Sequence, residues 1–138
     1  MSDRIENFRR RTVRERQEAE LKGMQHLLRG LLETIDDVAR FAHVDPSSTD
    51  AKTIVEGVAM VEKKLLKSLA GHGLEVIDPK GHPFDPALHE AMAQAPDDSV
   101  APNTVIGELQ RGYVLRDRLL RPARVIVSRR SGGEGGSG

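Results

Sequence analysis

The side chains that could do chemistry in this 138-residue sequence are few and scattered. There is no cysteine, which excludes disulfides and cysteine-based metal or redox chemistry. Three side chains, His82, Asp85 and His89, come close enough in sequence to be considered as metal ligands, but their spacing matches no established site. Asp36 and Asp37 are adjacent, so on a helix they point about 100° apart and do not form a catalytic pair. They are interpreted instead as a polar helix face with a cap or an ion pair. We therefore expect no enzyme active site, no metal and no cofactor.

The composition argues against nucleic acid and membranes as partners. Lys and Arg total 21 and Asp and Glu total 21, so the net charge is zero and gives no general attraction to anionic surfaces. No apolar run approaches the roughly 18 residues that a membrane span needs. The first residues lack the hydrophobic region of a signal peptide, so a cytoplasmic location is expected.

The first part of the chain is predicted to form one long helix, because residues 5–42 contain no proline. Its apolar residues recur at alternating steps of three and four, which is typical of a helix that pairs with another helix. They are Leu21, Met24, Leu28, Leu31, Ile35, Val38 and Ala42. Residues 9–18 are almost wholly polar, so pairing there should be loose. At about 1.5 Å per residue the helix would be roughly 60 Å long.

A second helix is expected after a break at residues 43–46, because proline disfavours helix in the residue before it. Residues 47–50 supply capping side chains, and residues 71–73 supply a glycine-rich end. One face of this helix carries Ile54, Val58, Val61, Leu65 and Leu69. Two antiparallel helices cannot enclose a core by themselves, so two chains are expected to form a four-helix bundle.

From residue 74 the pattern changes to short runs that are typical of β-strands. These runs cover residues 74–77, 104–110, 113–116 and 124–128, with a turn-rich spacer after residue 92. A small core is expected around Val76, Ile106, Leu115 and Val125. Asp85 before Pro86 indicates a turn or a helix N-cap.

The predicted fold class is α+β, with a long coiled-coil-like helix, a dimeric four-helix bundle and a small C-terminal β-domain. The predicted divisions are residues 1–73 for dimerisation, residues 74–130 for the β-domain, and residues 131–138 for a flexible tail rich in Gly and Ser. The expected dimerisation residues are Leu21, Met24, Leu28, Leu31, Ile35, Val38, Ile54, Val58, Val61 and Leu65.

Several sequence blocks, spread over nearly the whole chain, resemble the GrpE family of nucleotide exchange factors for DnaK-type heat-shock chaperones. The most specific blocks lie in the β-domain, namely PFDPALHEAM at residues 83–92 and GYVLRDRLLRPARVIV at residues 112–127. Similar blocks in the helices are FRRRT at residues 8–12, LLETIDDVAR at residues 31–40 and VEGV at residues 55–58.

The resemblance implies that one β-domain of a dimer enters the nucleotide-binding domain of the chaperone and opens its ADP cleft. It also implies which residues contact that partner. They are Pro83, Phe84, Leu109 and Arg118 in the β-domain, Arg9 and Arg10 in the long helix, and Gly57 in the bundle. Glu18 departs from the family pattern, because a basic contact residue is expected at that position.

Simpler interpretations remain for the same residues. Phe84 and Leu109 could be packing residues of the β-domain, and Arg118 could be a solvated turn residue. The arginines at 9–11 could form only a solvated helix face, and without an aromatic platform they make a poor nucleic-acid site. The alternative function is a structural coiled-coil dimer that acts as an adaptor without coupling to nucleotide.

Overall fold

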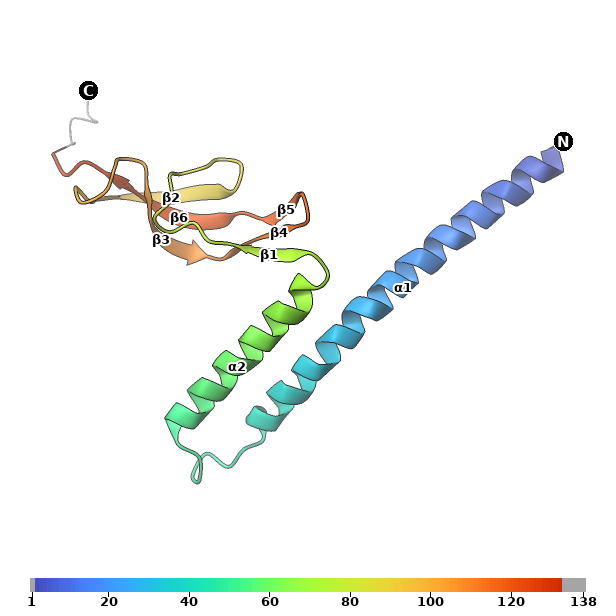
Figure 1. The fold of residues 1–138 in the computed structure, drawn as a ribbon, viewed down its shortest axis with the longest axis horizontal. Coiled ribbons are helices and arrows are strands. Elements are labelled where there is room, and N and C mark those ends of the chain that lie inside the picture. The colour runs from blue at the N-terminus through green and yellow to red at the C-terminus, as the bar shows by residue number, and fades with distance from the viewer. Residues whose placement is uncertain (1, 133–138) are drawn as a thin grey trace. The chain divides into compact units, whose positions relative to one another are not determined.

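The computed structural model describes residues 2–132, which form two helices followed by six strands (Figure 1). The contacts within the chain divide it between His72 and Gly73 into two compact units, one helical and one of β-structure. This arrangement confirms the predicted α+β fold class. Among the described residues, neither helix has a stretch apolar and long enough for a membrane span.

The two helices begin and end close to the predicted positions. Helix α1 spans Ser2–Ala42 and has 41 residues, and helix α2 spans Ala51–Ala70 and has 20 residues. In the connection, the Asp45 carboxylate accepts a hydrogen bond from the Ser47 backbone N–H at 2.9 Å. The Asp50 carboxylate accepts from the Thr53 backbone N–H at 2.7 Å and caps α2, and this bond lowers the pKa of Asp50. The predicted N-cap is therefore confirmed.

One face of α1 packs against α2 through residues that include Gly30, Asp37 and Phe41. Ser68 donates a hydrogen bond to the Gly30 carbonyl at 3.5 Å, and Lys64 donates to the Asp37 carboxylate at 3.0 Å. The Phe41 ring lies over Gly57. Because residues 30, 37 and 41 recur at helical spacing, they lie on one face of α1. This face is different from the one that carries the predicted apolar residues between Leu21 and Ala42.

The β-domain consists of two three-stranded sheets. One sheet has the order β1-β4-β5 and is antiparallel, with strands Leu74–Ile77, Gly112–Leu115 and Arg118–Arg121. The other has the order β2-β6-β3, with strands His89–Pro96, Ala123–Arg129 and Val105–Gln110. Strand β6 pairs in parallel with β2 and antiparallel with β3, so it is the central strand of its sheet.

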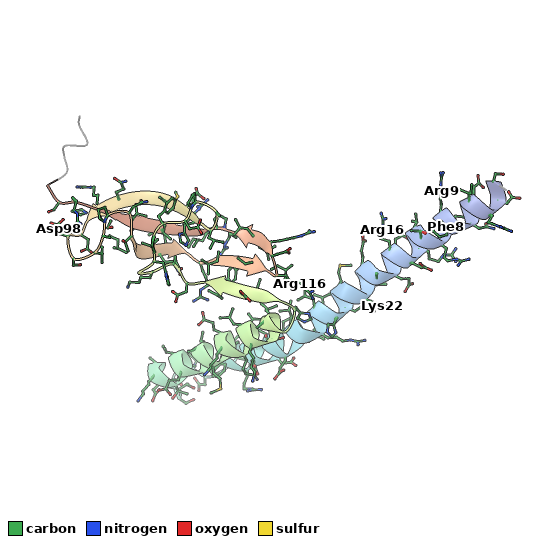
Figure 2. The ribbon with its side chains drawn as sticks, turned by 45° about the horizontal axis from the view of Figure 1, so that its top comes forward. Phe8, Arg9, Arg16, Lys22, Asp98 and Arg116 are labelled. Atoms are coloured by element: carbon green, nitrogen blue, oxygen red, sulfur yellow. The ribbon has the colours of Figure 1, made fainter. Side chains whose placement is uncertain are left out.

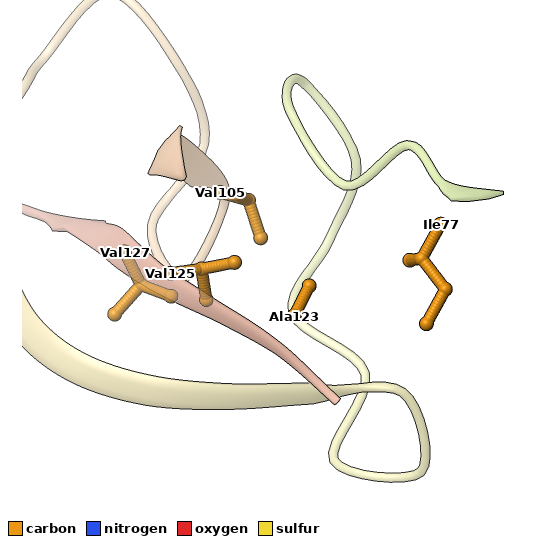
Figure 3. Packing of buried hydrophobic residues seen from close by; sticks show 5 residues of the cluster. All are labelled: Ile77, Val105, Ala123, Val125 and Val127. Carbon is orange, nitrogen blue, oxygen red and sulfur yellow. The ribbon is translucent and has the colours of Figure 1, made fainter. Parts of the chain in front are cut away.

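Alternate residues of β6 supply most of the buried core. Figure 3 shows the cluster, which consists of Ile77, Val105, Ala123, Val125 and Val127. The sequence prediction was right for Val125 but wrong for Val76, which is 40% exposed. Because successive side chains of a strand point to opposite faces, the neighbouring Ile77 is buried instead. On β3 the same alternation buries Val105 in the core and leaves the predicted core residue Ile106 half-buried. Leu115, on β4, is also only half-buried.

Two strands were missed by the sequence analysis. Residues 89–96, which include part of the expected turn-rich spacer, form β2, and residues 118–121 form β5. Strand β2 is rich in alanine and has no β-branched residue, so its local sequence does not favour a strand. Of the predicted tail, residues 133–138 lie outside the described residues.

Candidate partner-binding surfaces

The arginines near the beginning of α1 form an exposed basic surface. Arg9 and Arg10 line a shallow surface together with Val13, Arg14 and Gln17. No hydrogen bond or ion pair within residues 2–132 engages the Arg9 or Arg10 side chain. Figure 2 shows Arg9, Phe8 and Arg16 projecting from this part of the helix. The Arg9 and Arg10 side chains are therefore exposed to solvent in the single chain.

Glu18 lies on a neighbouring shallow surface of α1. This surface also contains Arg11, Arg14, Glu15 and Lys22, so it carries both acidic and basic groups. The carboxylate at position 18 therefore reduces the positive charge of the helix where the resemblance led us to expect a basic residue.

Pro83 and Phe84 are held by the loop that precedes β3. Pro83 forms an isolated β-bridge with Thr104, and the Phe84 backbone N–H donates to the Asn103 carbonyl at 2.9 Å. The Phe84 ring is half-buried, packs against the core cluster and lies 5.9 Å from the His89 ring centre. Phe84 is therefore at least in part a packing residue.

Leu109 and Arg118 both present their side chains to solvent. Leu109 lies on β3 and is 60% exposed, a large value for a leucine in a strand. Arg118 is the first residue of β5 and pairs with Leu115 across the β4–β5 turn. The two residues lie on different sheets, so the structure does not join them into one side-chain cluster.

The ten predicted dimerisation residues divide into two groups. Four of them, Leu31, Ile54, Val61 and Leu65, are half-buried within the single chain. The other six remain exposed and form what we call the apolar stripe. They are Leu21, Met24, Leu28, Ile35, Val38 and Val58. The apolar stripe is thus left uncovered by the contacts of one chain.

A charged cluster between the helices was not identified as a site from the sequence. Asp37 is only 5% exposed, and Lys64 lies 3.0 Å from both its carboxylate and that of Glu33. Arg40 lies 3.4 Å from Asp37 on the same helix. The hydrogen bonds to Asp37 and Glu33 raise the pKa of Lys64, because they stabilise its charged form. Lys64 therefore links α2 to two acidic residues of α1.

Gly57 lies in the contact between the two helices of one chain. A Cβ atom at this position would lie 2.3 Å from two atoms of the Phe41 ring. The glycine therefore lets the Phe41 ring rest on the backbone of α2, and any larger residue must displace it.

We expect Gly57→Ala to destabilise the helix pair by about 1–3 kcal/mol, as overpacking of a tight contact does. The helical circular dichroism signal should melt at a lower temperature. Gly23→Ala is the matched control, because its Cβ would meet no atom within 4 Å and alanine favours helix over glycine. Equal melting temperatures for the two variants would show that the Phe41 contact does not matter.

Asp85 and His89, two of the three residues considered as metal ligands, hydrogen-bond to each other within a turn. The Asp85 backbone N–H donates to His89 Nδ1 at 2.9 Å, and the Asp85 carboxylate accepts from the Ala87 backbone N–H at 2.9 Å. Asp85 thus organises a turn, as one of its two sequence interpretations predicted. Among the described residues, no group of three or more His, Asp or Glu side chains is arranged to hold a metal ion.

The structure thus defines an α+β protein with a long helix, a helix pair that leaves the apolar stripe uncovered, and a separate β-domain. The chain belongs to the GrpE family, whose family model matches residues 1–129. The protein named Protein GrpE from Geobacillus thermodenitrificans (strain NG80-2) is 46% identical over 124 residues, which cover 90% of this chain and 56% of that relative.

Further relatives give the same result. Protein GrpE from Parageobacillus thermoglucosidasius is 45% identical over 124 residues, covering 90% of this chain and 55% of the relative. Protein GrpE from Bacillus pumilus (strain SAFR-032) is 38% identical over the same number of residues, covering 90% and 67%. The chain therefore spans little more than half the length of the first of these relatives.

Proposed function

We propose that this chain is a homodimeric co-chaperone that promotes ADP release from a DnaK-type chaperone. The observation that carries the proposal is membership of the GrpE family over residues 1–129, which include both helices and the whole β-domain. The exposed side chains of Leu109 and Arg118 on the β-domain support it, because they are available to a partner. The proposal places the protein in the cytoplasm, with its chaperone.

The proposed activity requires no bond chemistry in the co-chaperone. It must bind the chaperone with an open nucleotide cleft more tightly than the closed ADP-bound form, since only a difference in affinity shifts the equilibrium. The coupling is reciprocal, so ADP must weaken the binding of the co-chaperone by the same factor.

The apolar stripe supports a dimer. Five apolar residues at helical spacing on α1 and Val58 on α2 remain exposed in the single chain, and a second copy would cover them in a four-helix bundle. The polar beginning of α1 has no such stripe. We therefore place the dimer contact at residues 21–38 of α1 together with α2.

Release of a fluorescent ADP analogue from the cognate chaperone tests the proposed function. We expect the rate to rise when the protein is added, and we expect ADP to weaken binding between the two proteins. Binding that is equally tight with and without ADP, with no change in release, would instead support the adaptor alternative.

We expect Arg118→Ala and Leu109→Ala each to weaken binding to the nucleotide-binding domain by about tenfold or more, because arginine and apolar anchors often contribute roughly 1–4 kcal/mol. The dimer should remain intact, since both residues lie outside the helices. Arg129→Ala and Met92→Ala are matched controls at exposed positions of other strands. If both test variants bind like the unmodified protein, these residues are not the contact.

A further inference from the structure

A groove in the β-domain lies apart from the proposed contact residues Leu109 and Arg118, neither of which lines it. It has a volume of about 390 Å³ and is lined by residues that include Glu75, Asp78, Pro83, Asp85, His89 and Val114. Pro83, which the family resemblance assigns to partner contact, forms part of its wall. Val114, together with Leu88 and Ile77, gives the groove an apolar surface beside its polar groups.

The charged groups that line this β-domain groove are all acidic. Glu75, Asp78 and Asp85 are the three acidic lining residues, and no Lys or Arg is among the lining residues. Asp85 uses one oxygen to accept from the Ala87 backbone N–H. Glu75 and Asp78 have no hydrogen bond or ion pair to any described residue. The groove therefore has unneutralised negative charge.

His89 adds a hydrogen-bond donor of fixed orientation. The residue is 6% exposed, and its Nδ1 accepts from the Asp85 backbone N–H at 2.9 Å. A neutral imidazole that accepts at Nδ1 carries its proton on Nε2. No described residue accepts from Nε2, and no buried side-chain nitrogen or oxygen in residues 2–132 lacks a partner. Nε2 is therefore not fully buried, and His89 is one of the residues that line the groove.

We propose that the β-domain groove binds an arginine or lysine side chain from an extended segment of the chaperone's nucleotide-binding domain. Glu75 and Asp78 pair with the cationic group, and the apolar surface at Val114 and Leu88 supports its aliphatic stem. His89 Nε2–H donates to a carbonyl oxygen of the same segment. This inference rests on the proposed function. It adds a contact between opposite charges to the binding surface proposed at Leu109 and Arg118.

The test compares binding of the dimer to the nucleotide-free nucleotide-binding domain at low and high salt. The double variant Glu75→Gln with Asp78→Asn removes two charges without changing side-chain size. We expect its affinity at low salt to fall about tenfold and its dependence on salt to become shallower, because a desolvated charge pair is lost. Glu90→Gln is the control, since it removes an acidic group on β2 whose ion pair with Arg124 is exposed.

A second measurement follows His89 directly by nitrogen NMR of its imidazole ring. The free protein should show the proton on Nε2, and this resonance should shift when the nucleotide-binding domain binds. An affinity of the double variant within about twofold of the unmodified protein, or an unchanged His89 resonance, overturns the inference while ADP release still supports the proposed function. Failure of the unmodified dimer to bind the chaperone overturns both.

Discussion

Replacing Ile35 with aspartate is expected to separate the dimer into monomers. Ile35 is 60% exposed in the single chain and lies in the apolar stripe between Leu28 and Val38. An aspartate there is solvated in a monomer but would be buried and unpaired in a four-helix bundle, which is costly. We expect the dissociation constant of the dimer to rise on the order of 100-fold or more, as measured by sedimentation equilibrium.

Arg29→Asp is the matched control for this experiment. Arg29 is on the same helix, is exposed, and lies neither on the apolar stripe nor on the face that packs against α2. Its dimer should stay intact. If Ile35→Asp also remains a dimer at micromolar concentration, the apolar stripe is not the dimer contact, and the bundle proposal is wrong.

Replacing Gly112 with alanine is expected to destabilise the β-domain severely. A Cβ atom there would lie 2.4 Å from the Ala123 nitrogen, 2.9 Å from the Ala123 Cα and 2.9 Å from the Arg121 carbonyl oxygen. All three atoms belong to the backbone, and Ala123 is fully buried in the core. The sheets must therefore separate locally, at about 1–3 kcal/mol or more. For a domain of this size the melting temperature should fall by roughly 5–20 °C.

Calorimetry and circular dichroism together can measure the melting temperature of the β-domain separately from that of the helices. Because the chain divides into a helical and a β-unit, we expect separate transitions in the unmodified protein, and only the β-transition should move in Gly112→Ala. Gly107→Ala is the control, since its Cβ would meet only the Ile126 side chain at 3.4–3.8 Å, an ordinary contact. A similar small shift in both variants would contradict the close approach at Gly112.

Local sequence was sufficient to predict both helices and four of the six strands. Proline at residue 46 and the cap at Asp50 define where α1 ends and α2 begins, because these effects act within one turn of the chain. Strand β6 contains the β-branched run Val125–Val127, and residues of this kind are enriched in strands. The blocks that resemble the GrpE family were also visible without the fold, since they depend only on residue order.

The tertiary structure decided the features that depend on residues distant in sequence. Strand β2 forms through its parallel pairing with β6, and the burial of Ile77 instead of Val76 depends on which face of β1 meets the core. Asp37 and Lys64 are 27 residues apart, so nothing local shows that they pair.

The same limit applies to the binding surfaces. Periodicity showed which apolar residues share one face of α1. Only the packing of α2 on a different face determined that the apolar stripe stays uncovered in the single chain. Gly57 and His89 were visible in the sequence, yet their contacts with Phe41 and with the Asp85 backbone were not. Side-chain type and spacing are local properties, whereas exposure, pairing and the direction of a hydrogen-bond donor arise only when distant segments pack together.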